Sequence, residues 1–224
     1  MKMKYGIAIA LLGLSTATVA GDIKLDTDQQ KVSYVLGYQA GAQMKQQNMN
    51  VDFETLTKAI KDGLDGTEPR LTGEQAAAVM QKFQAAQRAE QAKAGEDNAK
   101  AGVAYLAENK KKPGVITLEN GLQYKVITEG KGKTPKATDS VSVHYRGTLI
   151  DGKEFDSSYS RGEPTSFPVN RVIPGWTQIL QLMKEGDKWQ VFIPSELAYG
   201  ARGAGGDIGP DSTLIFDIEL LKVN

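Results

Sequence analysis

Residues 141–158 read VSVHYRGTLIDGKEFDSS, and this stretch carries the clearest structural signal in the chain. Apolar and polar side chains alternate through its first six residues, the period-two pattern of a strand with one buried face. The Asp-Gly pair at 151–152 is a hairpin turn signal, and the strand pattern resumes after it. The stretch therefore predicts two antiparallel strands, with Tyr145 on the buried face and His144 on the outward, polar face.

The same alternation recurs on both sides of this hairpin. Three further strands are predicted at residues 122–127, 189–193 and 213–221. One short helical stretch, 174–183, lies between them. Seven of the eight prolines and fourteen of the 24 glycines lie at or beyond residue 113, which makes this half of the chain rich in turns. We predict an α+β domain over residues 114–224, an antiparallel sheet with one short helix against it.

The part of the chain before residue 113 is different in kind. It holds one proline, Pro69, and its apolar residues recur at helical spacing. Each of three predicted helices opens with a capping side chain, and Gln30 completes a capping box in the first. The three caps are Thr27, Asp52 and Thr72. The third helix meets no proline before Asn109, so it is predicted to run unbroken to that residue.

These helices divide into a dimerisation domain over residues 21–70 and a long linker helix over residues 71–113. The two short helices hold too few large apolar residues to fold alone, so they are expected to pair with a second copy of themselves. The alternative is a small helical cap packed on the C-terminal domain. Beyond Phe83 the apolar side of the long helix is mostly alanine, which predicts an exposed, rigid spacer.

Residues 1–20 have the layout of a secretory signal peptide. Two lysines precede an apolar run over residues 6–14, and small residues lead to a cleavage site after Ala20. The run is too short to cross a bilayer as a helix, so we predict export, with an uncleaved membrane anchor as the alternative. The absence of cysteine after the apolar run excludes a lipid-modified N-terminus of the lipobox kind.

Composition removes several classes of chemistry. The chain has no cysteine and one histidine, which excludes disulfides, thiolate nucleophiles and multi-histidine metal sites. Its 27 basic residues balance 27 acidic ones, whereas nucleic-acid binders normally show a basic excess. An amide hydrolase would need His144 as its base, and that residue is predicted to face outward. We predict no metal, no cofactor and no nucleic-acid partner.

A set of aromatic residues near glycines and prolines remains to be explained. Each alone would be interpreted as a core residue, but the strings around them favour another interpretation. These strings are 143–147 (VHYRG), 151–158 (DGKEFDSS), 172–176 (VIPGW), 197–200 (LAYG) and 214–220 (LIFDIEL). In this order and spacing they resemble the FKBP-type peptidyl-prolyl isomerase domain over about residues 114–224. The signal peptide, first helix, linker helix and residues 205–210 resemble the macrophage infectivity potentiator (Mip) subfamily of envelope isomerases.

The resemblance implies a sheet of five or six strands wrapped around one helix, with a pocket for the substrate proline. Asp156 and Tyr199 would be the catalytic pair at its rim. The substrate-binding residues would be Tyr145, Phe155, Phe167, Val172, Ile173, Trp176, Ile208 and Phe216, with Trp176 as the floor. The resemblance also implies a site for macrolide inhibitors. Thr165 and Ala204 depart from the family pattern, at positions often held by an aromatic residue and a histidine.

The predicted function is prolyl isomerisation that accelerates proline-limited folding of exported polypeptides in the bacterial cell envelope. The protein is expected in the periplasm, or associated with the outer membrane or cell surface. An apolar pocket favours the twisted amide because its carbonyl is less polar than that of the planar ground state. The alternative is a non-catalytic envelope chaperone or adhesion-type binding protein that uses the same pocket.

Overall fold

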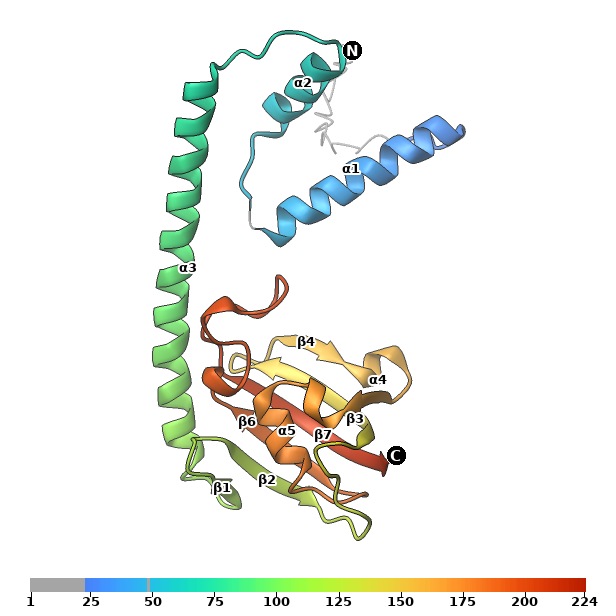
Figure 1. The fold of residues 1–224 in the computed structure, drawn as a ribbon, viewed down its shortest axis with the longest axis vertical. Coiled ribbons are helices and arrows are strands. Elements are labelled where there is room, and N and C mark those ends of the chain that lie inside the picture. The colour runs from blue at the N-terminus through green and yellow to red at the C-terminus, as the bar shows by residue number, and fades with distance from the viewer. Residues whose placement is uncertain (1–22, 48) are drawn as a thin grey trace, which may run out of the picture. The chain divides into compact units, whose positions relative to one another are not determined.

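The computed structural model describes residues 23–47 and 49–224, which fall into two units divided after Asn50 (Figure 1). The predicted signal peptide, residues 1–20, lies outside the described residues. Among residues 23–47 and 49–224, none of the helices combines the length and the hydropathy that a membrane span requires.

The first unit contains one helix, α1 (Asp28–Gln46). The Thr27 hydroxyl accepts a hydrogen bond from the Gln30 amide, and the Gln30 side chain accepts one from the Thr27 amide, which confirms the predicted capping box. No residue of α1 is buried, and its apolar side chains Val32 and Leu36 are 58% and 62% exposed. This helix therefore has no core of its own.

The second unit begins with two helices, α2 (Phe53–Leu64) and α3 (Gly73–Asn109). Their predicted caps are confirmed, because Asp52 accepts from the Thr55 amide at 2.7 Å and Thr72 accepts from the Gln75 amide at 3.2 Å. Helix α3 is 37 residues long and unbroken, as the absence of proline predicts.

The C-terminal part of this unit is an antiparallel sheet of seven strands, in the order β1-β2-β6-β7-β3-β4, with β5 also paired to β3. They are β1 (Val115–Thr117), β2 (Gln123–Thr128), β3 (Ser140–Leu149), β4 (Glu154–Ser157), β5 (Thr165–Pro168), β6 (Lys188–Ile193) and β7 (Leu214–Val223). The predicted hairpin and all three further predicted strands are confirmed. Strands β1 and β5 have three and four residues, too few for alternation to reveal them.

Helix α5 (Pro174–Leu180) crosses the face of the sheet and contributes buried side chains to the hydrophobic core (Figure 1). Trp176, Ile179 and Leu180 are buried on it, with Met183 just beyond its end. They pack against inward residues of β3, β6 and β7, among them Val143. Shorter elements connect the strands: α4 (Ser158–Arg161) and the 3₁₀ turns Val169–Arg171, Ser195–Leu197 and Gly200–Arg202.

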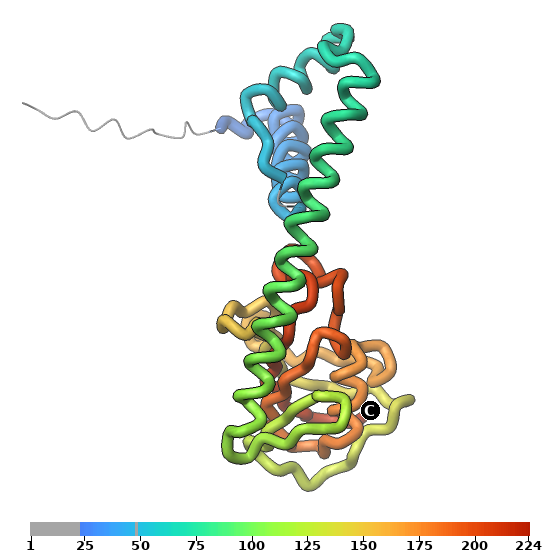
Figure 2. Tube along the Cα trace, turned by 90° about the vertical axis from the view of Figure 1, so that its left-hand side faces the viewer, coloured from blue at the N-terminus to red at the C-terminus, as the bar shows by residue number. Residues whose placement is uncertain are grey.

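The last turns of α3 lie against the sheet domain (Figure 2). Gly95, Gly102 and Asn109 recur every seven residues and are the buried residues of the helix. The Asn98 amide donates to the Pro210 carbonyl at 2.8 Å. A Cβ atom on Gly102 would lie 2.3 Å from the Thr213 hydroxyl oxygen, so only glycine permits this approach. The expectation of an exposed spacer is therefore wrong for the C-terminal third of α3, because two glycines bring its backbone onto the domain.

Candidate active site

A cavity of about 590 Å³ opens on the sheet domain between α5, β4 and the loop that follows Tyr199. All ten residues predicted for the site line it, and their roles remain predictions. They are Tyr145, Phe155, Asp156, Phe167, Val172, Ile173, Trp176, Tyr199, Ile208 and Phe216. Four further lining residues were not predicted to act there: Arg171, Ala204, Gly205 and Asp207.

The floor of the cavity is the indole ring of Trp176, which is 4% exposed. Three aromatic rings surround it, and each presents its edge or face at a steep angle. The centroid distances are 5.3 Å to Tyr145, 5.7 Å to Phe167 and 5.2 Å to Phe216. Edge-to-face packing is a preferred arrangement of aromatic rings and stabilises their relative positions by about 0.5–1.5 kcal/mol per pair. The cavity is therefore a preformed apolar box.

Glycine at position 147 makes room for one wall of this box. A Cβ atom there would lie 2.6 Å from the ring of Phe155 and 2.8 Å from that of Phe216. These rings pack edge to face over the backbone of β3, with centroids 5.5 Å apart. A larger residue at position 147, the last of the VHYRG string, would displace both rings.

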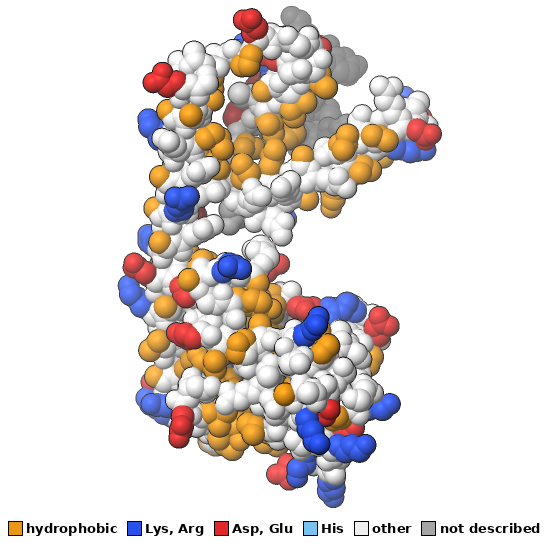
Figure 3. Space-filling model, viewed as in Figure 1, with side chains coloured by type: hydrophobic (Ala, Val, Ile, Leu, Met, Phe, Trp, Pro, Cys, Tyr) orange, Lys and Arg blue, Asp and Glu red, His pale blue; other side chains and the backbone are white. Residues whose placement is uncertain are grey.

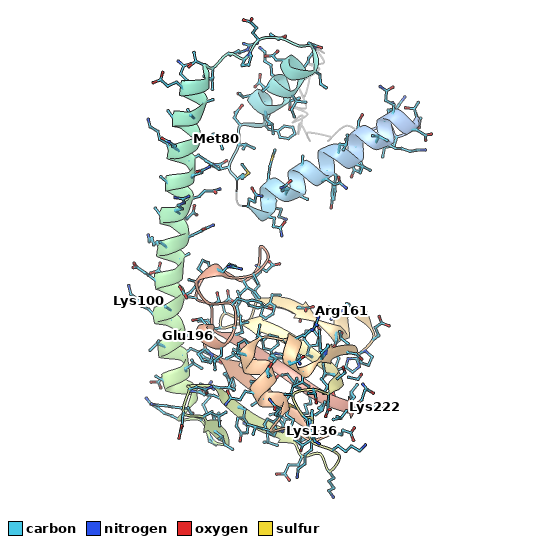
Figure 4. The ribbon with its side chains drawn as sticks, in the orientation of Figure 1. Met80, Lys100, Lys136, Arg161, Glu196 and Lys222 are labelled. Carbon is cyan, nitrogen blue, oxygen red and sulfur yellow. The ribbon has the colours of Figure 1, made fainter. Side chains whose placement is uncertain are left out.

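The polar side of the rim is a hydrogen-bonded cluster around Asp156. The Tyr145 hydroxyl donates to one carboxylate oxygen and Arg161 donates to the other. Arg161, labelled in Figure 4, also donates to the Tyr145 hydroxyl oxygen at 2.8 Å and to Thr165 at 3.2 Å. Burial disfavours the charged form of Asp156, but the bonds from Tyr145 and Arg161 outweigh it and hold the pKa of this carboxyl below its usual value.

Sequence reasoning missed Arg161, which completes this cluster. Its position five residues after Asp156 gives no periodic signal, because the short helix α4 turns the chain between them. The departure at Thr165 gains a meaning here, since its hydroxyl accepts from the same guanidinium.

Tyr199 stands on the rim with 42% of its surface exposed. Its hydroxyl makes no hydrogen bond with the described residues, so its proton is available to a ligand. Burial, together with the negative charge of Asp156, raises the pKa of Tyr199 above its usual value of 10.0. The phenol therefore stays protonated at neutral pH and can serve as a donor.

His144 lies away from the cavity, as the strand alternation predicts. Its Nδ1 is 3.0 Å from the Ser158 hydroxyl oxygen, and its ring stacks on Tyr159 with centroids 4.7 Å apart. Ser158 in turn accepts from the Tyr145 amide at 2.8 Å, so this contact supports the backbone behind the cavity. Across residues 23–47 and 49–224, no three potential ligand side chains are grouped as a metal site would require.

Two family models match the chain. One, for FKBP-type peptidyl-prolyl cis-trans isomerase, covers residues 131–221, and the other, for the domain amino terminal to it, covers residues 29–126. The first spans the cavity and the second spans the three helices. The chain belongs to the FKBP-type peptidyl-prolyl cis-trans isomerase family.

Relatives of this FKBP family member extend the match to the whole chain. The outer membrane protein MIP of Legionella longbeachae is 47% identical over 100% of this chain and 98% of its own length. The FKBP-type 22 kDa peptidyl-prolyl cis-trans isomerase of Escherichia coli is 45% identical over 88% of this chain and 97% of its own. The crystal structure of FkpA from Escherichia coli covers 90% of this chain at a TM-score of 0.64 and 40% identity. The FKBP-like fold and the Mip-type architecture are thereby confirmed.

Proposed function

We propose that this protein is a peptidyl-prolyl cis-trans isomerase that acts on proline-containing polypeptides. The observation that carries the proposal is the aromatic box on Trp176, bordered by hydrogen-bonding groups at its rim. The matched family and the relatives named as isomerases support the same activity.

The chemistry that this cavity must perform is rotation, with no bond made or broken. Planarity of the X–Pro amide is maintained by resonance, and rotation meets a barrier of about 18–20 kcal/mol. The twisted amide has lost this resonance, and its carbonyl is less polar than in the planar state. An apolar, water-poor box therefore binds the twisted form in preference, and each ~1.4 kcal/mol of preference accelerates the reaction tenfold.

The rim groups would hold the substrate in position. The Tyr199 hydroxyl, which stays protonated because its pKa is raised, can donate a hydrogen bond to a substrate carbonyl. Asp156, kept ionised by Tyr145 and Arg161, places a fixed negative charge beside the rotating amide. Because these partners fix the carboxylate before substrate arrives, little reorganisation is needed at the transition state.

A protease-free NMR exchange measurement on a prolyl tetrapeptide such as Ala-Leu-Pro-Phe tests the proposal. The isomerase is expected to accelerate cis–trans exchange in proportion to its concentration. Peptide binding without acceleration would favour the non-catalytic chaperone or adhesion-type protein instead. The same cavity is proposed to admit macrolide inhibitors, and competition with the peptide would reveal this.

The setting that we propose is the bacterial cell envelope, with the protein working on exported polypeptides. The signal-like layout of residues 1–20 supports export. A relative carries the name outer membrane protein, which is compatible with this location. A processed N-terminus beginning at Gly21 on the protein isolated from cells would test the cleavage, and an N-terminus at Met1 would contradict it.

We further propose that the protein forms a homodimer through residues 21–70. Helix α2 exposes Phe53 (76%) and Leu64 (84%), and α1 exposes Val32 and Leu36. Hydrophobic side chains are visible on the surfaces of both helices (Figure 3). Apolar surface on helices without a core is typical of an interface with a second copy.

A further inference from the structure

Three charged side chains line the cavity: Asp156, Arg171 and Asp207. Two of them are already compensated by cations outside the lining. Asp156 is paired with Arg161, and the Lys153 ammonium is 2.8 Å from a carboxylate oxygen of Asp207. Each of the two carboxylates that line the cavity is therefore neutralised by a neighbouring cation.

Arg171 is the charge that remains. It ends the 3₁₀ turn Val169–Arg171 and directly precedes Val172 and Ile173, which form part of the cavity wall. Its side chain is exposed, and no carboxylate of the described residues pairs with its guanidinium. The lining therefore carries one uncompensated positive charge beside an otherwise apolar box.

A guanidinium has a planar fork of donors that fits a carboxylate with two parallel hydrogen bonds. A ligand seated in the box would bring the side chains that flank its proline past this fork. A carboxylate on the ligand would meet an unpaired partner there, whereas an ammonium would meet repulsion. The long, flexible arginine stem can reach such a group without moving the backbone.

We propose that Arg171 makes this isomerase prefer prolyl segments that carry Asp or Glu directly before or directly after the proline. The inference rests on the proposed function and concerns which substrates are selected. Arg171 is a specificity-determining residue in this scheme and takes no part in the rotation itself.

The experiment compares kcat/KM, from NMR exchange on the full-length protein, for peptides that differ by one charge. One pair is Ala-Glu-Pro-Phe against Ala-Gln-Pro-Phe, and the other is Ala-Leu-Pro-Glu against Ala-Leu-Pro-Gln, with blocked ends. The Glu peptide of at least one pair is expected to be favoured by roughly three- to tenfold at low salt. The preference should fall toward unity in 1 M NaCl, where the screening length is about 3 Å.

Variants of Arg171 test whether its guanidinium causes the preference for the Glu peptides. Arg171→Gln should bring the Glu-to-Gln ratio to about one, Arg171→Lys should retain part of it, and Arg171→Glu should invert it. Arg202→Gln is the matched control, an exposed arginine that does not line the cavity, and it should keep the wild-type ratio. A ratio near one for both pairs in the wild type, or an unchanged ratio in Arg171→Gln, would overturn the proposal.

The uncharged Ala-Leu-Pro-Phe separates the two hypotheses. If that peptide is accelerated without any preference for Glu, the assignment of Arg171 fails and the isomerase activity stands. If no peptide is accelerated, the proposed function itself is contradicted.

Discussion

Asp156 is the residue on which the rim is built, since Tyr145 and Arg161 both donate to it. We predict that Asp156→Ala lowers kcat/KM by roughly tenfold or more, the scale of losing one charge-assisted hydrogen bond at the transition state. Secondary structure should persist, because the side chain lies at a partly exposed rim. The NMR exchange assay with circular dichroism measures both.

Glu163→Gln provides the control, because Glu163 is an exposed carboxylate outside the cavity lining. It should retain wild-type activity. Full activity in Asp156→Ala would remove the role assigned to this carboxylate.

Tyr199→Phe tests the free donor on the other part of the rim. The substitution removes one hydroxyl and leaves the ring that lines the cavity. We expect kcat/KM to fall by roughly five- to tenfold, as for one neutral hydrogen bond made in the transition state. An unchanged kcat/KM, measured at several peptide concentrations, would show that the substrate carbonyl has another partner.

The titrating residues predict a flat pH profile. The pKa of Asp156 is held below its ordinary value of 3.8, so its charge and its contribution to stability are present above that value and are lost as pH falls through the lowered pKa. Burial and the bond to Asp156 raise the pKa of Tyr145, and burial raises that of Tyr199. Initial rates should therefore be nearly constant between about pH 6 and 8.5.

His144→Gln should show the same profile, since His144 contacts Ser158 and Tyr159 instead of the cavity. A pH-dependent step in the wild-type rate that disappears in this variant would mean that the imidazole reaches the chemistry. The mechanism in which an apolar, water-poor cavity favours the twisted amide would then have to be withdrawn.

At the scale of elements, the contact between α3 and the sheet domain depends on Gly102. We predict that Gly102→Ala destabilises the protein by about 1–3 kcal/mol, because the new methyl overlaps the buried Thr213 side chain. Gly95→Ala should cost less, since its nearest obstacle is the Asp211 carboxylate at 2.9 Å. Chemical denaturation monitored by fluorescence measures the difference.

Gly73→Ala is the matched control on the same helix, because nothing lies within 4 Å of a Cβ atom there. It should be neutral or slightly stabilising. Thr213→Ala should offset part of the effect of Gly102→Ala in the double variant. Equal stability of Gly73→Ala and Gly102→Ala would contradict the close packing of the helix.

At the scale of the whole molecule, the helical and sheet regions should be separable in function. Deletion of residues 21–70 is expected to change the particle from two chains to one, as light scattering measures against the mass of the shortened chain, because the exposed apolar helices are removed. Short-peptide isomerisation should be retained. Acceleration of proline-limited refolding of a whole protein should decrease, since one cavity replaces two linked ones. A particle that still contains two shortened chains would show that dimerisation uses another surface.

Much of the fold was predictable from short stretches, because capping and alternation are written in neighbouring residues. The capping box of Thr27 and Gln30 predicted the start of α1. The alternation of apolar and polar residues in β3 predicted that Tyr145 faces inward and His144 outward. The ten residues predicted for the site came from the family resemblance, and eight of them lie in the five strings that carry it, all except Phe167 and Ile208. Composition alone would have assigned the same aromatics to the core.

The contacts that complete the site and dock α3 were decided only by the tertiary structure. Arg161 joins Asp156 around a turn, Lys153 meets Asp207 across 54 positions, and Asn98 reaches the Pro210 carbonyl across 112. Nothing local records such pairs, since their geometry depends on how distant segments pack. Gly102 illustrates the reason: in the sequence it is a weak helix former, and only the position of Thr213 beside it explains why no larger residue fits.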